Sequence, residues 1–323
     1  MSAAVRAYQR SLFGNTESSD CVVRFYLPPK PAKKSKKKRV KAEEVELDFI
    51  GDPLPGHLLI LRPGSSFFKS QAERWSGVAK PPSDAELELR VPLEDPGDLR
   101  HALSTIGFTY TGELDVEGAT DLLSVRRIAS FLGVEGCLEA VDAALVARAQ
   151  SGLHGVVELY ACRQLLPGRD DDPAAAALLP ALQAACREGL AKSLRVPMAT
   201  LPLPSGGSVK AGEVLAWAFP DAPSVLSDPA TKRQLLALPA AALEALLSSE
   251  SFGTDMEDTV LLLLAEWLSA HHGVAQNMTG VVERLCRCVR LSQLSSVYLH
   301  GVLPLVDWFP ISPPELRFIQ QYR

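Results

Sequence analysis

The chain has 323 residues, 47% of them hydrophobic, and its formal net charge is −5. This length is sufficient for one large domain or two ordinary ones, each with its own core. No stretch is long and apolar enough to cross a bilayer, and the first residues lack the apolar core of a signal peptide, so we expect a soluble intracellular protein with no membrane partner.

Neither the cysteines nor the histidines predict a disulfide or a metal site. The six cysteines are scattered and form no CxxC pair, so buried reduced thiols are the expectation. His271 and His272 are adjacent, whereas two ligands on one helix face need i, i+3 or i+4 spacing. The chain also lacks the GxSxG, GxxxxGKS/T, GxGxxG and HExxH motifs. The sequence therefore favours binding over catalysis, and we expect no enzyme activity and no cofactor.

Three alternating segments in the first part of the chain predict strands of a small sheet. They are residues 18–28 (SSDCVVRFYLP), 44–51 (EVELDFIG) and 85–93 (AELELRVPL). Between the second and third segments, HLLILRPGSSFFKSQAERW predicts two short helices divided at Pro63-Gly64. Residues 1–16 are polar, and we expect them to form a flexible N-terminus.

A run of basic residues separates the first two predicted strands. Its members are Lys30, Lys33, Lys34, Lys36, Lys37, Lys38, Arg39 and Lys41. The flanking strands predict a hairpin in which residues 28–44 are a loop insertion. The run could bind nucleic acid, bind a membrane surface, serve as a nuclear import signal, or be a solvated loop without a binding role. The rest of the chain is acidic and would repel phosphates, and the run has no apolar face for a bilayer, so we expect neither of the first two.

The remainder of the chain is predicted to be helical. Asp95 can cap a helix that Gly112 ends, and two more helices are expected within residues 118–149. Further along, Asp228 is expected to cap a helix, and residues 254–257 (TDME) predict a capping box. Residues 196–224 are rich in Pro, Gly and Ser, where we expect a loop or insertion. Early strands and late helices together indicate an α+β fold followed by an all-α domain.

This order of elements resembles the BTB/POZ family, a small mixed sheet capped by helices. Ser19-Asp20 is similar to the family's Ser-Asp opening, and HLLILRPGSSFF (57–68) to its His-Lys-x-x-Leu…Ser-x-x-Phe segment. IGFTYTG (106–112) resembles the apolar-x-Tyr-Thr-Gly signature. The resemblance implies a BTB/POZ domain over residues 17–148.

The later helices resemble the BACK domain, the helical companion of many BTB proteins. Residues 235–268 are similar to its core pattern of Leu-Pro, Leu-Leu-Ser-Ser, an acidic turn and a helix ending in Trp. The resemblance implies a BACK-like domain over residues 149–310 and a C-terminal tail at 311–323. Within the superfamily, the chain looks closest to the plant light-response type.

The chain departs from the BTB pattern at several positions. Leu58 and Pro63-Gly64 replace the family's Lys and Ala-Arg, so Arg62 becomes the candidate partner of Asp20. Cullin-binding members carry a hydrophobic-x-acidic motif, for which Ala72-Glu73 is the nearest equivalent here.

The BTB and BACK resemblances together imply a non-enzymatic substrate adaptor of a cullin-3 RING ubiquitin ligase. Such an adaptor forms a homodimer through its BTB domain, docks cullin-3 and holds a protein substrate, which the sequence does not identify. The expected partner-binding residues are Asp20, Phe68, Trp75 and Tyr110, with core packing as the alternative for Phe68 and Tyr110. A cullin-independent BTB scaffold, or a nuclear, transcription-associated homodimer, is the alternative function.

Within this frame, the basic run is either an import signal or a solvated loop. Exposed Lys/Arg clusters are typical of nuclear localisation signals. The residues concerned are Lys33, Lys34, Lys36, Lys37, Lys38 and Arg39. We therefore expect the protein in the nucleus, the cytoplasm or both.

Overall fold

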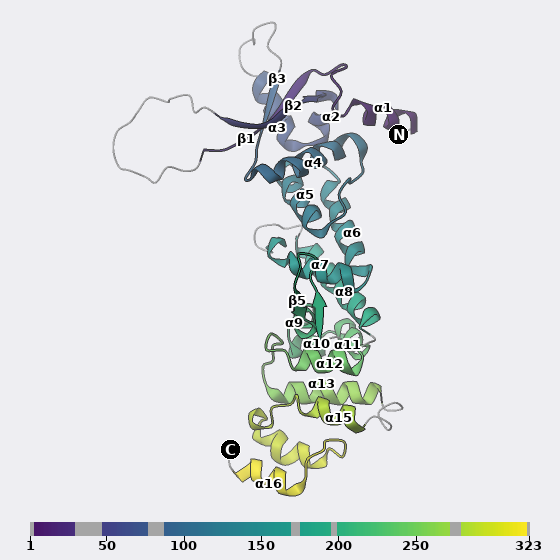
Figure 1. Cartoon of the computed structure of the whole chain (residues 1–323), viewed down its shortest axis with the longest axis vertical. Helices are drawn as coiled ribbons and strands as arrows, with labels where there is room; N and C mark the ends of the chain where they lie inside the picture. The colour runs from purple at the N-terminus through teal and green to yellow at the C-terminus, as the bar shows by residue number, and fades with distance from the viewer. Residues whose placement is uncertain are drawn as a thin grey trace, which may run out of the picture. The chain divides into compact units, whose positions relative to one another are not determined.

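A computed structural model describes residues 3–29, 47–76, 87–168, 175–194, 199–271 and 279–321. The chain divides into two compact units, Met1–Leu145 and Val146–Arg323. Strands dominate the start of the first unit and helices the second, which agrees with the predicted α+β class (Figure 1). In the part of the chain that is described, no helix is long and apolar enough to span a membrane.

The first unit is built on a three-stranded sheet in the order β2-β1-β3. The strands are β1 (Cys21–Leu27), β2 (Asp48–Gly56) and β3 (Leu87–Pro92). β1 pairs antiparallel with β2 and parallel with β3. In β1, Cys21, Val23 and Phe25 are buried and alternate with more exposed residues, so one face of the sheet lies against the core.

Helices precede, separate and follow the strands of this sheet along the chain. They are α1 (Ala3–Leu12), α2 (Leu58–Gly64), α3 (Ser66–Ser76), α4 (Leu99–Thr111), α5 (Ala119–Leu132) and α6 (Cys137–Gln150). The predicted cap at Asp95 is confirmed for the short helical turn Pro96–Asp98 that leads into α4, since Asp95 Oδ1 accepts a hydrogen bond from Gly97 N at 2.8 Å. Helix α4 itself has Asp98 as N-cap, without a side-chain cap. Gly112 ends α4 with φ 68°, a left-handed conformation that favours glycine.

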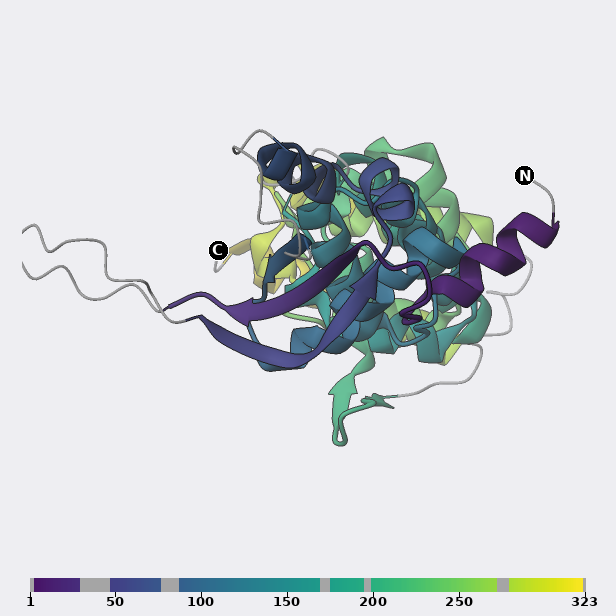
Figure 2. The same ribbon diagram turned by 90° about the horizontal axis from the view of Figure 1, so that it is seen from above.

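The expected flexible N-terminus is wrong for most of residues 1–16, because residues 3–12 form helix α1. Leu12 is buried, and the ring of Phe13 packs against that of Tyr110 with centroids 5.5 Å apart. These contacts attach α1 to α4. Figures 1 and 2 both show α1 at the end of the β1–β2 pair opposite the ends that carry Leu27 and Asp48.

The second unit is almost entirely helical. Its helices are α7 (Leu153–Ala161), α8 (Ala175–Ser193), α9 (Ala211–Ala218), α10 (Ala222–Ser227), α11 (Pro229–Leu236), α12 (Ala240–Leu247), α13 (Glu257–Ala270), α15 (Thr279–Cys286) and α16 (Pro313–Gln321). Short helical turns η3 (Leu291–Gln293), η4 (Tyr298–Val302) and η5 (Leu303–Leu305) connect α15 to α16. Asp228 caps α11 as predicted, accepting from Thr231 N at 2.9 Å.

Two expectations for this unit are corrected. Residues 196–224 are not simply a loop, because a hairpin of β4 (Thr200–Pro202) and β5 (Ser208–Lys210) precedes α9 and α10; the hairpin protrudes in Figure 2. Residues 203–207 connect the two strands: Gly206 N donates to Leu203 O at 3.1 Å around Pro204-Ser205, and Gly206 and Gly207, with φ 88° and 81°, lead into β5. The capping box at 254–257 is absent, because α13 begins at Glu257 with Met256 as N-cap and no side-chain cap.

Glu257 and Asp258 are the first residues of α13, and their buried carboxylates bind backbone amides of a distant segment instead of capping the helix. Glu257 Oε1 accepts a hydrogen bond from Arg290 N at 2.7 Å, and Asp258 Oδ1 accepts one from Ser295 N at 2.8 Å. Carboxylates are also favourable at a helix N-terminus because of the helix dipole. The two side chains therefore fix the segment 290–295 against α13.

Candidate interaction surfaces

Asp20 holds the start of α2 in place. It is exposed, and its Oδ1 accepts a hydrogen bond from Leu58 N, the first amide of that helix, at 2.7 Å. The expected pairing of Asp20 with Arg62 is wrong, because Arg62 forms its ion pair with Glu73 at 3.5 Å. Asp20 thus satisfies one of the amides that a helix leaves unpaired at its N-terminus.

Phe68 and Tyr110 lie in the core of the first unit, as the core-packing alternative predicts, and not on a partner-binding surface. Phe68 is 0% exposed and Tyr110 3%. The Tyr110 hydroxyl accepts a hydrogen bond from His57 N at 3.1 Å, and burial raises the pKa of this phenol to about 12. A side chain that anchors a partner has to be accessible, so Phe68 and Tyr110 stabilise the fold instead of contacting a partner.

Two groups of predicted residues lie wholly or partly outside the described part of the chain. Trp75 lies in the last turn of α3, but its side chain is not among those that are described. The basic residues Lys33, Lys34, Lys36, Lys37, Lys38 and Arg39 fall in 30–46, outside the described residues.

An aromatic patch covers the contact between α3 and α5. The rings of Phe67 and Phe131 pack with centroids 5.1 Å apart, and Phe131 is 53% exposed. Beside it is a cavity of about 260 Å³, lined by Val91, Leu93, Ile128 and Phe131 among others. We call this patch and its cavity the α3–α5 surface.

A charged cluster borders the α3–α5 surface. Arg127 binds the carboxylate of Asp98 at 2.6 Å and also pairs with Glu94, and all three residues line the cavity. Asp98 is buried, while Arg127 and Glu94 are exposed. An exposed aromatic ring, here Phe131 backed by the half-buried Phe67, with a charged rim is typical of a protein-binding anchor.

A second surface of the first unit joins α1 and α2. Leu59 on α2 is 87% exposed. Leu59 lines a groove of about 570 Å³ together with Arg6, Gln9 and residues of α4. We call this the α1–α2 surface.

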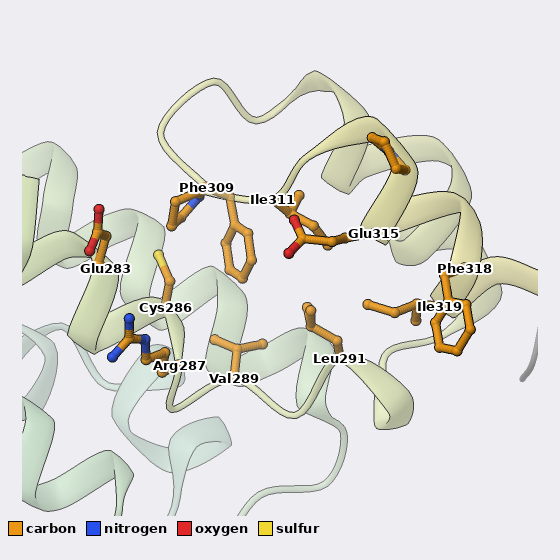
Figure 3. A pocket seen from close by; sticks show the side chains of 12 residues that line it. Glu283, Cys286, Arg287, Val289, Leu291, Phe309, Ile311, Glu315, Phe318 and Ile319 are labelled. Carbon is orange, nitrogen blue, oxygen red and sulfur yellow. The ribbon is translucent and has the colours of Figure 1, made fainter.

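A third surface is the groove between α15 and α16 in the second unit. Figure 3 shows its side chains, which are mainly apolar and come from the end of α15, the chain near Phe309 and α16. Its volume is about 900 Å³.

Neither metal binding nor thiol chemistry has support among the described residues. No group of three or more His, Cys, Asp and Glu in the described ranges could hold a metal ion. Burial raises the pKa of the Cys137, Cys186 and Cys286 thiols to about 12, so these thiols stay protonated and are poor nucleophiles at neutral pH.

Sequence reasoning chose Phe68 and missed its neighbour Phe67 and the more distant Phe131. Helical periodicity held a partial signal, since Leu132, Ile128 and Leu122 mark the buried face of α5 and Phe131 lies off that face. In α3 the residues after the two phenylalanines are mostly polar, so no periodic apolar pattern showed which ring turns inward.

A comparison with protein families supports the reading of the second unit. Residues 225–304 match the family model of BACK, "BTB And C-terminal Kelch". The match runs from α10 to η5, less than half of the chain, and it supports a protein of the BTB–BACK type with a role in protein interaction. No curated protein matches the chain. A BTB fold for the first unit and the plant light-response type stay predictions.

Proposed function

We propose that this protein is a non-enzymatic adaptor of the BTB–BACK type that links cullin-3 to a protein substrate in a RING ubiquitin ligase. The observation that carries the proposal is the BACK match at residues 225–304, in a helical unit that follows an α+β unit. The mixed sheet of the first unit and its element order support a BTB/POZ domain there.

The α3–α5 surface is the proposed docking site for the cullin. Phe67 and Phe131 offer aromatic anchors, and the adjacent cavity can receive an apolar side chain of the partner. Arg127 and Glu94 form an exposed polar rim, which would contribute to orientation and association rate more than to affinity.

Pull-down of a purified cullin-3 N-terminal domain tests this docking site. We expect wild type to bind and Phe131→Asp to weaken binding by about tenfold or more, because a carboxylate would have to be desolvated in the interface. Phe49→Asp is the matched control, since Phe49 is 40% exposed on β2, at the other edge of the sheet. Failure of wild type to bind, or equal loss for both variants once each is shown to be folded, would refute the docking proposal.

The α1–α2 surface is the proposed homodimer contact. Leu59 is large and exposed and lines the groove between α1 and α2, so a second copy could cover it. Light scattering at micromolar concentration should give a dimer for wild type and a monomer for Leu59→Asp. A wild-type monomer would contradict dimerisation, and a Leu59→Asp dimer would place the contact elsewhere.

The cullin-independent scaffold remains the alternative outcome of the pull-down. A dimer that does not bind cullin-3 would have this function, either in the cytoplasm or as a nuclear regulator. We also propose that residues 33–39 direct part of the protein to the nucleus, on the strength of their composition.

A further inference from the structure

The groove between α15 and α16 has two apolar walls that are not packed against each other. Figure 3 shows Val289 and Leu291 on one side of the opening and Phe309 and Ile311 across from them. Protein interiors are packed closely, so apolar walls around a space of about 900 Å³ lack contacts that a further apolar segment could supply.

One wall of this groove is firmly held and the other is lightly attached. Glu257 and Asp258 fix the segment 290–295, which includes Leu291, through the backbone hydrogen bonds described above. By contrast, α16 has no buried residue, and Phe318 on it is 62% exposed. Gln320 Nε2 donates to Leu299 O at 3.0 Å, linking α16 to η4. The groove therefore has one fixed wall, formed by the segment 290–295, and one wall, formed by α16, that can adjust to an occupant.

The charged groups at the groove are more acidic than basic. In Figure 3 the carboxylates of Glu283 and Glu315 lie along the upper edge of the opening, with the guanidinium of Arg287 below. Among the described residues, neither Glu283 nor Arg287 has an ion-pair partner. Ser312 donates to Glu315 Oε2 from its amide and its hydroxyl, which lowers the pKa of that carboxyl and keeps it ionised. An occupant with basic side chains would complement this edge.

We propose that the groove binds an amphipathic helix of a partner protein. Its apolar face would carry large side chains at i, i+3 or i+4, and i+7, and its flank would carry Lys or Arg facing Glu283. Helices line both sides of the groove, as is typical of helix-in-groove recognition. This extends the proposed adaptor function by naming the surface that holds the second partner.

A displayed library of helical peptides about four turns long, selected on the full chain, tests the proposal. The library varies the apolar positions and allows Lys, Arg or Glu at the flanks. We expect selected peptides to carry large apolar residues at helical spacing and more Lys and Arg than Glu. Their Kd is then measured by fluorescence anisotropy. Ile311→Asp and Phe318→Asp should each raise the Kd by about tenfold or more, since both place a carboxylate in the apolar groove.

Two further variants separate this site from the rest of the unit. Leu305→Asp is the matched control, because Leu305 is 80% exposed in η5 and lies outside the groove lining, so the Kd should stay unchanged. Glu283→Lys should weaken peptides that carry Lys or Arg and strengthen otherwise identical peptides that carry Glu.

The proposal fails if selection enriches no sequence, or if Ile311→Asp binds the selected peptides as tightly as wild type. It also fails if light scattering shows that Phe318→Asp separates a wild-type dimer, because the occupant would then be a second copy. No cullin takes part in these measurements, so their failure leaves the cullin proposal standing. Equally, failure of the cullin pull-down leaves the peptide-binding proposal standing.

Discussion

Replacing Tyr110 by Phe is expected to destabilise the first unit by about 1–3 kcal/mol at neutral pH. The ring of Tyr110 stays in contact with Phe13 in this variant, so only the hydroxyl is lost. Without it, the buried amide of His57 has no acceptor in place of the oxygen now 3.1 Å away, and His57 Nδ1 loses a neighbour at 3.4 Å.

The pH dependence of this difference gives a more specific test. Burial, the largest cause, raises the pKa of Tyr110 from 10.0 to about 12, so the folded state holds the phenol proton more tightly than the unfolded chain does. The resulting stability is complete below about pH 10 and is lost as the pH rises from 10 towards 12. At about 1.4 kcal/mol per pKa unit, the loss is at most about 3 kcal/mol for wild type and zero for Tyr110→Phe.

Urea unfolding followed by circular dichroism, on both proteins at pH 8 and through the alkaline range, measures this difference. Buried thiols such as Cys137 also titrate at high pH, but they do so in both proteins and cancel in the comparison. We expect the stability advantage of wild type over Tyr110→Phe to shrink as the pH approaches 12. An advantage that stays constant from pH 8 to the alkaline limit would refute the assignment of Tyr110 as a buried phenol.

Two further predictions concern the helical unit and the basic run. Gly212→Ala should destabilise the fold by about 1–3 kcal/mol, because the new Cβ would lie 2.3 Å from the carbonyl oxygen of Ala245 and force α9 away from α12. Gly280→Ala is the control: a Cβ at Gly280 has no atom within 4 Å, so this variant should stabilise the fold by up to about 1 kcal/mol. Thermal unfolding of both variants measures this, and equal shifts would contradict the close approach. Deleting residues 30–41 should leave the melting temperature unchanged and move a fluorescent fusion out of the nucleus, whereas unchanged localisation would exclude an import signal.

Local sequence signals determined most of the elements that the structure contains. Asp95 and Asp228 carry their capping role in their own side chains, and Gly112 supplies the left-handed turn, so each could be recognised from its neighbours. The hairpin of β4 and β5 has a weaker local signal, because its connection is five residues long and turns at Pro204-Ser205 before the two glycines.

The candidate surfaces depended on contacts between distant parts of the chain, which local patterns do not contain. Phe67 and Phe68 are chemically identical neighbours, and only the packing of α3 against β3 and α5 buries Phe68 fully and leaves Phe67 half-buried against Phe131. Helix α1 does have a local signal, because most of its residues are Ala, Arg, Gln or Leu, which favour helices. Its attachment through Leu12 and Phe13 to the rest of the unit depends on distant contacts.

The pairing of Leu27 with Asp48 at the ends of β1 and β2 brings the two flanks of the basic run together. The two ends of the connection are therefore held next to each other by the strand pairing, whatever the length of the connection. The entropic cost of closing a longer loop rises only slowly with its length. This position is therefore suited to the insertion of a folded reporter whose own termini are close together. Such an internal fusion would leave both ends of the chain unmodified, including the α1 helix that follows the N-terminus.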